Sequence, residues 1–294
     1  MTQAIFVGLS TIDVVYDVDK FPSPNRKAAA KSQEVFVGGP ATNACITFAH
    51  LGGQAALATA VGRHPLSHMV REEIQKYSIQ LLDLNSKFEE VPVISSVTVD
   101  RNGNRNVVSA NALRVQTPPA EVDANLIRRA GLVLVDGHYM QACLAWAEAA
   151  RGQKVPVVFD GGSWKEGTAE LLKNVHTAIC SADFLPPGCK TRDDVTQFLR
   201  NAGVASIAIT DGSNPIHFAS GATSGTLRVP DVEVVDTMGS GDVFHGAFCF
   251  FASTGLGFVE SLAEAAAIAA ESCRYHGTRA WMKAVTAESF AVPA

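Results

Sequence analysis

Through the second half of the sequence, short runs of apolar and β-branched residues alternate with longer amphipathic segments. The runs that we predict to be buried strands are residues 132–135, 155–159, 178–180 and 206–210. The predicted helices between and after them are residues 139–151, 166–174, 191–201, 240–254 and 259–276. Strands that are apolar on both faces and joined by helices are typical of a mostly parallel sheet, because helices then cover both faces. The alternation therefore predicts an α/β fold.

Two segments interrupt this pattern and have the character of exposed β-structure. Residues 14–37 are polar and rich in β-forming residues, with prolines at positions 22 and 24. Residues 91–110 alternate apolar and polar side chains around Asn102-Gly103, a dipeptide that favours a tight turn between two strands. We expect the two segments to pair into a small sheet that projects from the main domain. Such a sheet can be a lid over a binding cleft, a dimerisation surface, or both.

The composition is that of one large folded domain, and we treat residues 1–294 as a single unit. Hydrophobic residues make up 47% of the chain and charged residues 18%, which is enough apolar surface to bury a core. The net charge is −5 and no stretch is strongly basic, so neither nucleic acid nor a membrane surface is expected as a partner. The first residues lack the apolar core of a targeting signal, and we expect a soluble, cytoplasmic protein.

The cysteines are scattered and include no C-x-x-C pair. Most of them have apolar neighbours, which predicts buried, reduced thiols rather than disulfides or a zinc site. The six are Cys45, Cys143, Cys180, Cys189, Cys249 and Cys273.

Several widespread catalytic motifs are absent from the sequence. There is no G-x-x-x-x-G-K-[ST] phosphate loop, no G-x-G-x-x-G turn, no H-E-x-x-H pair and no G-x-S-x-G elbow. Their absence argues against P-loop nucleotide hydrolases, NAD-dependent dehydrogenases, zinc proteases and serine hydrolases.

The segment D-T-M-G-S-G-D at residues 236–242 runs directly into an apolar helical stretch. Small residues at the start of a helix leave backbone N–H groups free, and the helix dipole adds positive potential, so the segment predicts an anion site suited to a phosphoryl group. Asp242 would lie in the first helical turn, where a carboxylate can accept the proton of an attacking hydroxyl. The alternative is a Gly-Asp turn in which Asp242 only stabilises the helix start.

These residues resemble a known signature. DTMGSGDVFHGAF is similar to the element DTxGAGDxFxxG of the ribokinase-like, pfkB-type carbohydrate kinases, with Ser240 in place of the usual alanine. Gly38-Gly39-Pro40-Ala41-Thr42-Asn43 resembles the GGxxxN element of the same family. The resemblance covers essentially the whole chain and is strongest to the ketohexokinase and sulfofructose kinase side. It implies a ribokinase-like fold: a central, mostly parallel sheet flanked by helices, with a small β-sheet lid.

The resemblance also implies roles for individual residues. Asp242 would be the catalytic base, and Gly239, Ser240 and Gly241 would form the anion hole for the transferred phosphate. The residues expected to bind hydroxyl groups of the substrate are Asp13, Gly39 and Asn43. The residues expected to border ATP are Thr210, Gly212, Ala269, Cys273 and Gly277. Asp236 and Thr237 lie where many members bind a monovalent cation such as K⁺.

The sequence departs from the family where magnesium is usually organised. The N-x-x-E element should lie near Ser181-Ala182-Asp183-Phe184, but serine replaces asparagine and no glutamate follows. Asp183 is the carboxylate that could take over the role toward Mg²⁺ from a shifted position.

The resemblance implies an ATP-dependent kinase acting on a primary hydroxyl of a small sugar, a ketose or a related sugar. Further substrate contacts are expected from His138, which follows the strand 132–135, and from Arg105 and Asn111 on and after the hairpin. A nucleoside kinase of the same fold remains an alternative, because Phe21, Phe36 and Phe88 could stack on a base. A catalytically weak sugar-binding regulator is the second alternative. We expect a homodimer formed through the lids, because the exposed apolar face of a small sheet needs cover.

Overall fold

The computed structural model describes residues 3–110, 112, 115, 117 and 122–285. Asn111, expected to contact the substrate, lies outside the described residues. In the central sheet the strand order is β13-β12-β11-β10-β9-β8-β1-β4-β5, and the pairs from β11 to β5 are all parallel. The strands are β1 (Gln3–Val7), β4 (Gln54–Thr59), β5 (Gln80–Asp83), β8 (Ala130–Val135), β9 (Val157–Gly161), β10 (Thr177–Ser181), β11 (Ser206–Asp211), β12 (Asn214–Ser220) and β13 (Thr223–Leu227). The last two form an antiparallel edge.

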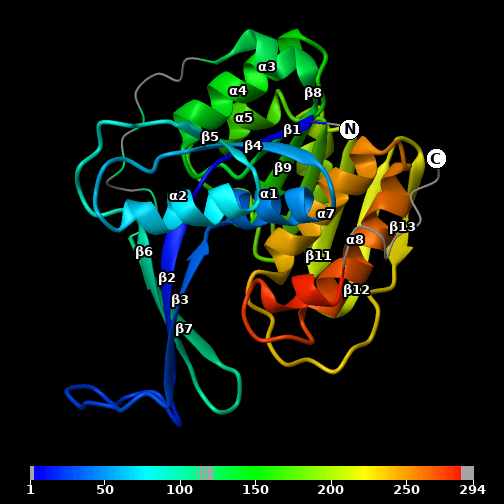
Figure 1. The fold of residues 1–294 in the computed structure, drawn as a ribbon. Helices are drawn as coiled ribbons and strands as arrows, with labels where there is room; N and C mark the ends of the chain where they lie inside the picture. Colours follow the sequence, from blue (N-terminus) through cyan, green and yellow to red (C-terminus); the bar gives the residue numbers. More distant parts are fainter. Residues whose placement is uncertain (1–2, 111, 113–114, 116, 118–121, 286–294) are drawn as a thin grey trace.

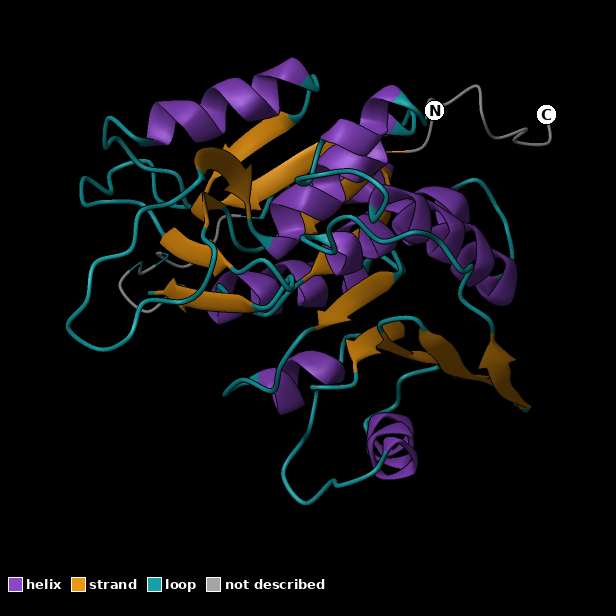
Figure 2. Cartoon of the chain, turned by 90° about the horizontal axis from the view of Figure 1, so that it is seen from below, coloured by secondary structure: helices purple, strands orange, loops and turns teal. Residues whose placement is uncertain are grey.

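Helices cover both faces of this sheet (Figures 1 and 2). They are α1 (Pro40–His50), α2 (Ser67–Lys76), α3 (Ala124–Arg129), α4 (Met140–Gly152), α5 (Thr168–Leu172), α6 (Arg192–Asn201), α7 (Ser240–Ser253), α8 (Phe258–Ser272) and the 3₁₀ turn η1 (Ala280–Lys283). Alternate residues of β1 enter different cores. Phe6 belongs to the core that contains residues of α1, α7 and α8, whereas Ile5 belongs to the core that contains residues of α3, α4, α5 and α6. The predicted α/β fold is confirmed, because strands buried on both faces require helices on both.

The two β-rich segments pair with each other, as predicted. The strands β2 (Thr11–Asp17), β3 (Ser32–Gly38), β6 (Ile94–Val99) and β7 (Arg105–Ser109) form a separate sheet in the order β3-β2-β6-β7. Figure 1 shows this sheet as a ribbon that extends away from the helices. The hairpin turn lies where Asn102-Gly103 predicts it, with Gly103 at φ 78° and the Asp100 carboxylate accepting the N–H group of Asn102 at 2.8 Å. We call this four-stranded unit the lid sheet.

The cysteines are free thiols, as predicted, and all but the half-buried Cys189 are buried. Within the part of the chain that the structure describes, no helix combines the length and the apolar character needed to cross a membrane.

Candidate active site

Helix α7 begins within the glycine-rich segment 236–242. Gly239 caps the helix with φ 70°, a left-handed conformation that glycine adopts without strain. The N–H group of Ser240 donates to the carbonyl oxygen of Thr237 at 3.3 Å, which closes a turn before the helix. The next N–H groups, of Gly241 and Asp242, belong to the first helical turn and have no acceptor inside the helix. The start of α7 therefore offers backbone donors and the positive end of a helix dipole to an anion.

A chain of side-chain hydrogen bonds connects Asp242 to α1. Nδ2 of Asn43 donates to Oδ2 of Asp242 at 2.7 Å, and Oδ1 of Asn43 accepts from Nη2 of Arg279 at 2.9 Å. Arg279 also donates to Oε1 of Glu73 at 3.1 Å and to the carbonyl oxygen of Val37 at 3.0 Å. Because a guanidinium group only donates, Arg279 orients the Asn43 amide with its NH₂ group toward Asp242. Asn43 thus contacts the expected base directly, and Arg279 and Glu73, which the sequence motifs did not reveal, hold it in place.

A glycine allows α7 to approach α1 closely enough for this contact. A Cβ atom on Gly246 would lie 2.3 Å from the carbonyl oxygen of Ala44 and 2.7 Å from Cβ of Thr47. Both neighbours belong to α1, one and four residues after Asn43. Because backbone atoms cannot yield to such an overlap, only glycine permits this separation of the two helices.

The environment of Asp242 makes its carboxyl group much easier to protonate than an ordinary aspartate. Burial and the nearby Asp160 carboxylate raise the pKa of Asp242 to about 7, while the hydrogen bond from Asn43 opposes the rise. A carboxylate with this pKa can both take up and release a proton at physiological pH, which is the property required of a general base. Burial also raises the pKa of Asp160, the penultimate residue of β9.

His245 occupies the space beneath the first turn of α7. Its Nδ1 atom lies 2.7 Å from the carbonyl oxygen of Gly241, and Nε2 lies 3.2 Å from the carbonyl oxygen of Ile179 in β10. Nε2 is also 3.6 Å from Oδ1 of Asp160. The ring therefore ties the start of α7 to two strands of the central sheet.

Asp13 and the glycine pair lie where the lid sheet meets the central sheet. Asp13 is on β2, opposite Phe36 of β3, and burial raises the pKa of its carboxyl group. A Cβ atom on Gly38 would lie 2.0 Å from Oδ2 of Asp13, and one on Gly39 would lie 2.2 Å from the carbonyl oxygen of Leu9. The two glycines thus leave room for the Asp13 carboxylate and for the start of α1 beside the chain that follows β1.

A buried carboxylate that the sequence motifs did not reveal holds three segments together. Oδ2 of Asp136 accepts the N–H groups of Leu9 at 2.8 Å and Ala41 at 3.3 Å, and Oδ1 accepts that of His138 at 2.9 Å. A Cβ atom on Gly8 would lie 2.1 Å from the carboxylate, so that position requires glycine. Asp136 therefore positions the ends of β1 and β8 and the start of α1.

His138, expected to contact the substrate, follows β8 at the same edge of the sheet. Burial lowers the pKa of its ring, which favours the neutral form. Lys165 approaches the same strand end, with Nζ 3.4 Å from the carbonyl oxygen of Asp136. Sequence reasoning did not single out Lys165.

A cavity of about 500 Å³ opens beside the start of α7. Four of the five residues expected to border ATP line it: Thr210, Gly212, Ala269 and Cys273. Three residues of the glycine-rich segment also line it: Thr237, Ser240 and Gly241. Its other walls are largely apolar and include Ile216, Val229, Pro230 and Phe244. An apolar cavity that ends at a helix N-terminus suits a ligand with a flat apolar part and an anionic part.

Gly277, the fifth residue expected at the nucleotide, does not line this cavity. Its N–H group donates to Oδ2 of Asp236 at 3.0 Å. Oδ1 of Asp236 accepts from Nη2 of Arg105 at 2.6 Å, and the same nitrogen donates to Oγ1 of Thr237 at 2.8 Å. Arg105, expected to reach the substrate, thus contacts the two residues expected to hold a monovalent cation.

The residues near the expected magnesium element form only a sparse donor set. Asp183 is exposed after β10, and its N–H group donates to Oγ of Ser181 at 3.2 Å. Oγ of Ser181 in turn donates to the carbonyl oxygen of Gly162 at 2.9 Å. Among the described residues, no group of three or more His, Cys, Asp or Glu side chains is arranged to hold a metal ion. A single exposed carboxylate still fits Mg²⁺, which keeps several water ligands and binds phosphate oxygens directly.

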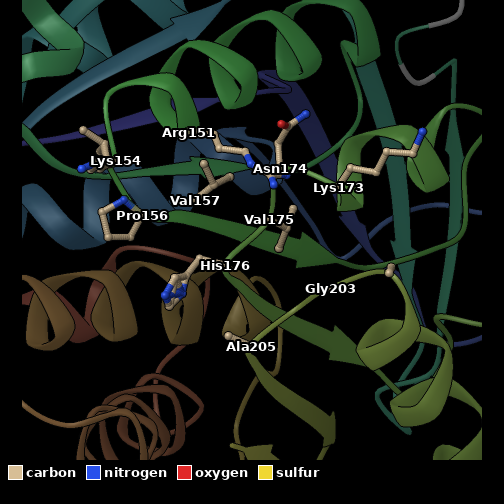
Figure 3. A pocket seen from close by; sticks show the side chains of 12 residues that line it. Arg151, Lys154, Pro156, Val157, Lys173, Asn174, Val175, His176, Gly203 and Ala205 are labelled. Carbon is tan, nitrogen blue, oxygen red and sulfur yellow. The ribbon is translucent and has the colours of Figure 1, made fainter.

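A larger cavity, of about 640 Å³, lies at the opposite end of β9, β10 and β11 (Figure 3). Its basic residues are Arg151, Lys154, Lys173 and His176. Helices α4, α5 and α6 end here, so their carbonyl groups and negative dipole ends face this side, and basic side chains there stabilise the helix ends. The 500 Å³ cavity is the stronger candidate for a phosphate-bearing ligand, because α7 begins there.

The comparisons with known proteins agree with this geometry. The model of the pfkB family carbohydrate kinases matches residues 1–284. The chain is 24% identical over 262 residues to the bifunctional ribokinase/ribose-5-phosphate isomerase A of Fructilactobacillus sanfranciscensis, covering 84% of this chain but only 48% of that protein. It is 20% identical over 290 residues to ketohexokinase of Mus musculus, covering 94% of this chain and 97% of that one. The structure of Arabidopsis thaliana ribokinase complexed with ribose and ATP matches 96% of this chain and 97% of its own, with a TM-score of 0.77 at 20% identity.

Proposed function

Because this chain belongs to the pfkB family of carbohydrate kinases, we propose that it transfers the γ-phosphate of ATP to a primary hydroxyl of a small sugar, a ketose or a related sugar. The observation that carries the proposal is the position of Asp242. This carboxyl group, with a pKa raised to about 7, lies in the first turn of α7, beside the cavity that the predicted nucleotide residues line. This position supports the proposal that Asp242 acts as a general base beside an anion site.

In this proposal the acceptor hydroxyl loses its proton to Asp242 as its oxygen attacks the γ-phosphorus, and ADP leaves. Negative charge that develops on the phosphoryl oxygens is stabilised by the N–H groups at the start of α7. Asn43 and Arg279 keep the carboxylate oriented, because the Asn43 amide donates to the oxygen that does not take the proton. Mg²⁺ bound with ATP would neutralise the phosphates, with Asp183 as its candidate carboxylate partner.

The acceptor would lie between the lid sheet and the ends of β1 and β8. Asp13 and His138 border this region, and hydroxyl groups donate readily to a carboxylate or to a neutral imidazole nitrogen. A neutral, polyhydroxylated molecule is therefore the substrate class that we propose. The relatives named ketohexokinase and ribokinase support a ketose or a pentose.

A substrate panel tests this function. ADP release would be measured with ketoses, aldopentoses, sugar acids and nucleosides at saturating ATP and magnesium, with Asp242→Asn as the matched background. We expect turnover with at least one ketose or pentose, and phosphate on a primary hydroxyl of the product. Turnover confined to nucleosides would replace the proposal with a nucleoside kinase, and sugar binding without turnover would indicate a regulator.

A further inference from the structure

The tip of the lid sheet contacts the loop that leads into the anion site. Arg105 is the first residue of β7, directly after the hairpin turn, and its Nη2 atom donates to Oδ1 of Asp236 at 2.6 Å and to Oγ1 of Thr237 at 2.8 Å. The side chains of Arg105 and Asp236 are only 27% and 13% exposed. An ion pair this sheltered is screened less by water and salt than a surface pair.

The opposite edge of the lid sheet contacts the same region. Nε2 of His276 lies 2.7 Å from Oε2 of Glu34 on β3. The ring of Phe36 on β3 lies so close to Gly277 that a Cβ atom there would be 3.0 Å from it. The strand register places Glu34, Phe36 and Arg105 on one face of the lid sheet, which also carries Asp13. One face of the lid sheet therefore carries both a predicted substrate residue and the contacts to this loop.

Asp236 joins the glycine-rich segment to the segment after α8, and both segments border the 500 Å³ cavity. Its Oδ1 atom accepts the N–H group of Met238 at 2.9 Å, and its Oδ2 atom accepts that of Gly277 at 3.0 Å. Thr237 and Cys273, which belong to these two segments, both line the cavity. Arg105 supplies a cationic partner for this half-buried carboxylate from the lid sheet, and Nδ1 of His276 lies 3.6 Å from its Oδ2 atom.

We propose that Arg105 is a positioning residue. It couples closure of the lid sheet over the acceptor to ordering of residues 236–239, the loop that leads into the start of α7. The inference rests on the proposed kinase function. When the lid sheet is closed, Arg105 holds Asp236 and Thr237 in place, and the turn before α7 is fixed. When the loop is ordered by nucleotide, the docking site for Arg105 is complete. Acceptor and nucleotide then bind cooperatively, each raising the affinity of the other by the same factor.

Hydrogen exchange tests the coupling without relying on turnover. Amide exchange in β3 and β7 would be measured with and without a non-hydrolysable ATP analogue, in the natural protein and in Arg105→Ala. We expect the analogue to slow amide exchange in these strands of the natural protein and to leave the exchange rates unchanged in Arg105→Ala. Equal protection in both proteins, or none in the natural protein, would overturn the proposal.

Two further variants make this result specific. Arg101→Ala removes another arginine of the same hairpin. The Arg101 side chain is mostly exposed, and its ion pair with Asp19 is long, at 3.9 Å. This variant should therefore respond to the analogue as the natural protein does. Arg105→Lys keeps the charge and should retain part of the protection. Melting curves of all the variants would show whether Arg105→Ala is folded. If Arg105→Ala is not folded, the exchange response of Arg105→Lys tests the proposal instead, and protection equal to that of the natural protein would overturn it.

Binding and kinetics separate this proposal from the proposed function. In the natural protein the acceptor should lower the Kd of the ATP analogue by a factor in the usual range for coupled sites, about 5- to 150-fold, and in Arg105→Ala that factor should fall toward one. The KM for ATP should rise more than kcat falls, and added guanidinium ion should restore part of the loss. If the natural protein phosphorylates no sugar, the proposed function fails, while the exchange experiment still decides the role of Arg105. An unchanged coupling factor in Arg105→Ala would overturn the inference alone.

Discussion

At the scale of single residues, the proposed chemistry depends on how the surroundings of Asp242 change its proton affinity. Burial and Asp160 raise the pKa, and the Asn43 amide lowers it. Asn43 can do this in only one orientation, which Arg279 sets by donating to its oxygen. Asp242 is thus tuned by residues that are far away in the sequence.

Replacing Asp242 with asparagine should abolish proton uptake while leaving the backbone donors of α7 intact. General-base catalysis typically contributes ~10²–10⁴-fold, so we expect kcat to fall by about that factor, with little change in the KM values. Steady-state kinetics on a variant whose fold is checked by its melting temperature would measure this. A folded variant with near-normal turnover would show that Asp242 only stabilises the helix start.

The same pKa predicts opposite effects of pH on rate and on stability. The base must be ionised, so kcat should rise through about pH 7 and be roughly tenfold below its plateau one pH unit lower. The pKa of Asp242 in the folded chain exceeds the value of about 3.9 for an unfolded chain. Protonation of Asp242 therefore stabilises the folded state fully below about pH 3.9. This contribution to the free energy of unfolding is lost as pH rises through about 7. Asp242→Asn should therefore melt above the natural protein at about pH 8, with a gap that narrows toward acid. A flat rate profile, or a gap of opposite sign, would contradict the assigned pKa.

Asp183 gives the test of how magnesium is held. If its exposed carboxylate contacts the hydrated ion, Asp183→Ala should raise the magnesium concentration needed for half-maximal rate by severalfold, with a smaller effect on the plateau. Glu166→Ala, which removes another exposed carboxylate, should not change the magnesium dependence. An unchanged dependence in Asp183→Ala would mean that nucleotide phosphates and other groups hold the ion.

At the scale of elements, the site depends on how closely α7 packs on α1. Gly246 removes the side chain that would otherwise hold the helices apart, and the contact between Asn43 and Asp242 follows from that packing. The positions of β8 and α1 depend similarly on the Asp136 carboxylate, which accepts N–H groups from three segments.

Gly246→Ala should both destabilise the protein and slow it. The added Cβ would lie 2.3 Å from a backbone oxygen, and overpacking of this kind costs about 1–3 kcal/mol. Chemical denaturation would measure this loss, and kcat should fall because the helices must separate. Gly152→Ala at the end of α4 is the matched control, because nothing lies within 4 Å of its added Cβ. A stabilised, fully active Gly246→Ala would contradict the packing argument.

At the scale of the whole molecule, the lid sheet has one face toward the site and one toward solvent. The outward face carries Val35 and Val108, which are 43% and 75% exposed, in one row with Val14 and Ser96. An exposed apolar surface on a thin sheet is typical of an interaction surface.

We propose that two copies of the chain associate through these outer faces. Sedimentation should then show a dimer, and Val35→Asp combined with Val108→Asp should shift the population to monomer. Leu185→Asp changes an exposed apolar residue outside the lid sheet and should leave the association unchanged. A natural protein that remains monomeric at high concentration would contradict the association.

Local patterns in the sequence determined the α/β fold, the hairpin at Asn102-Gly103, and the helix start with its carboxylate at Asp242. Each is decided by residues that are neighbours along the chain, because strand burial, turn geometry and helix initiation act over a few residues. The family resemblance also brought together residues of three distant segments, such as Thr210, Ser240 and Ala269, which the structure shows around one cavity.

Only the tertiary structure decided the partners of the charged groups. The chain from Asp242 through Asn43 to Arg279 joins residues that are 199 and 236 positions apart, and Arg105 lies 131 positions from Asp236. No local pattern encodes such pairs, since they depend on the strand order and on how far the lid sheet reaches. The same reason explains why Arg105 was expected at the substrate: a hairpin sequence specifies the turn, but which loop its tip contacts depends on the packing of the rest of the molecule.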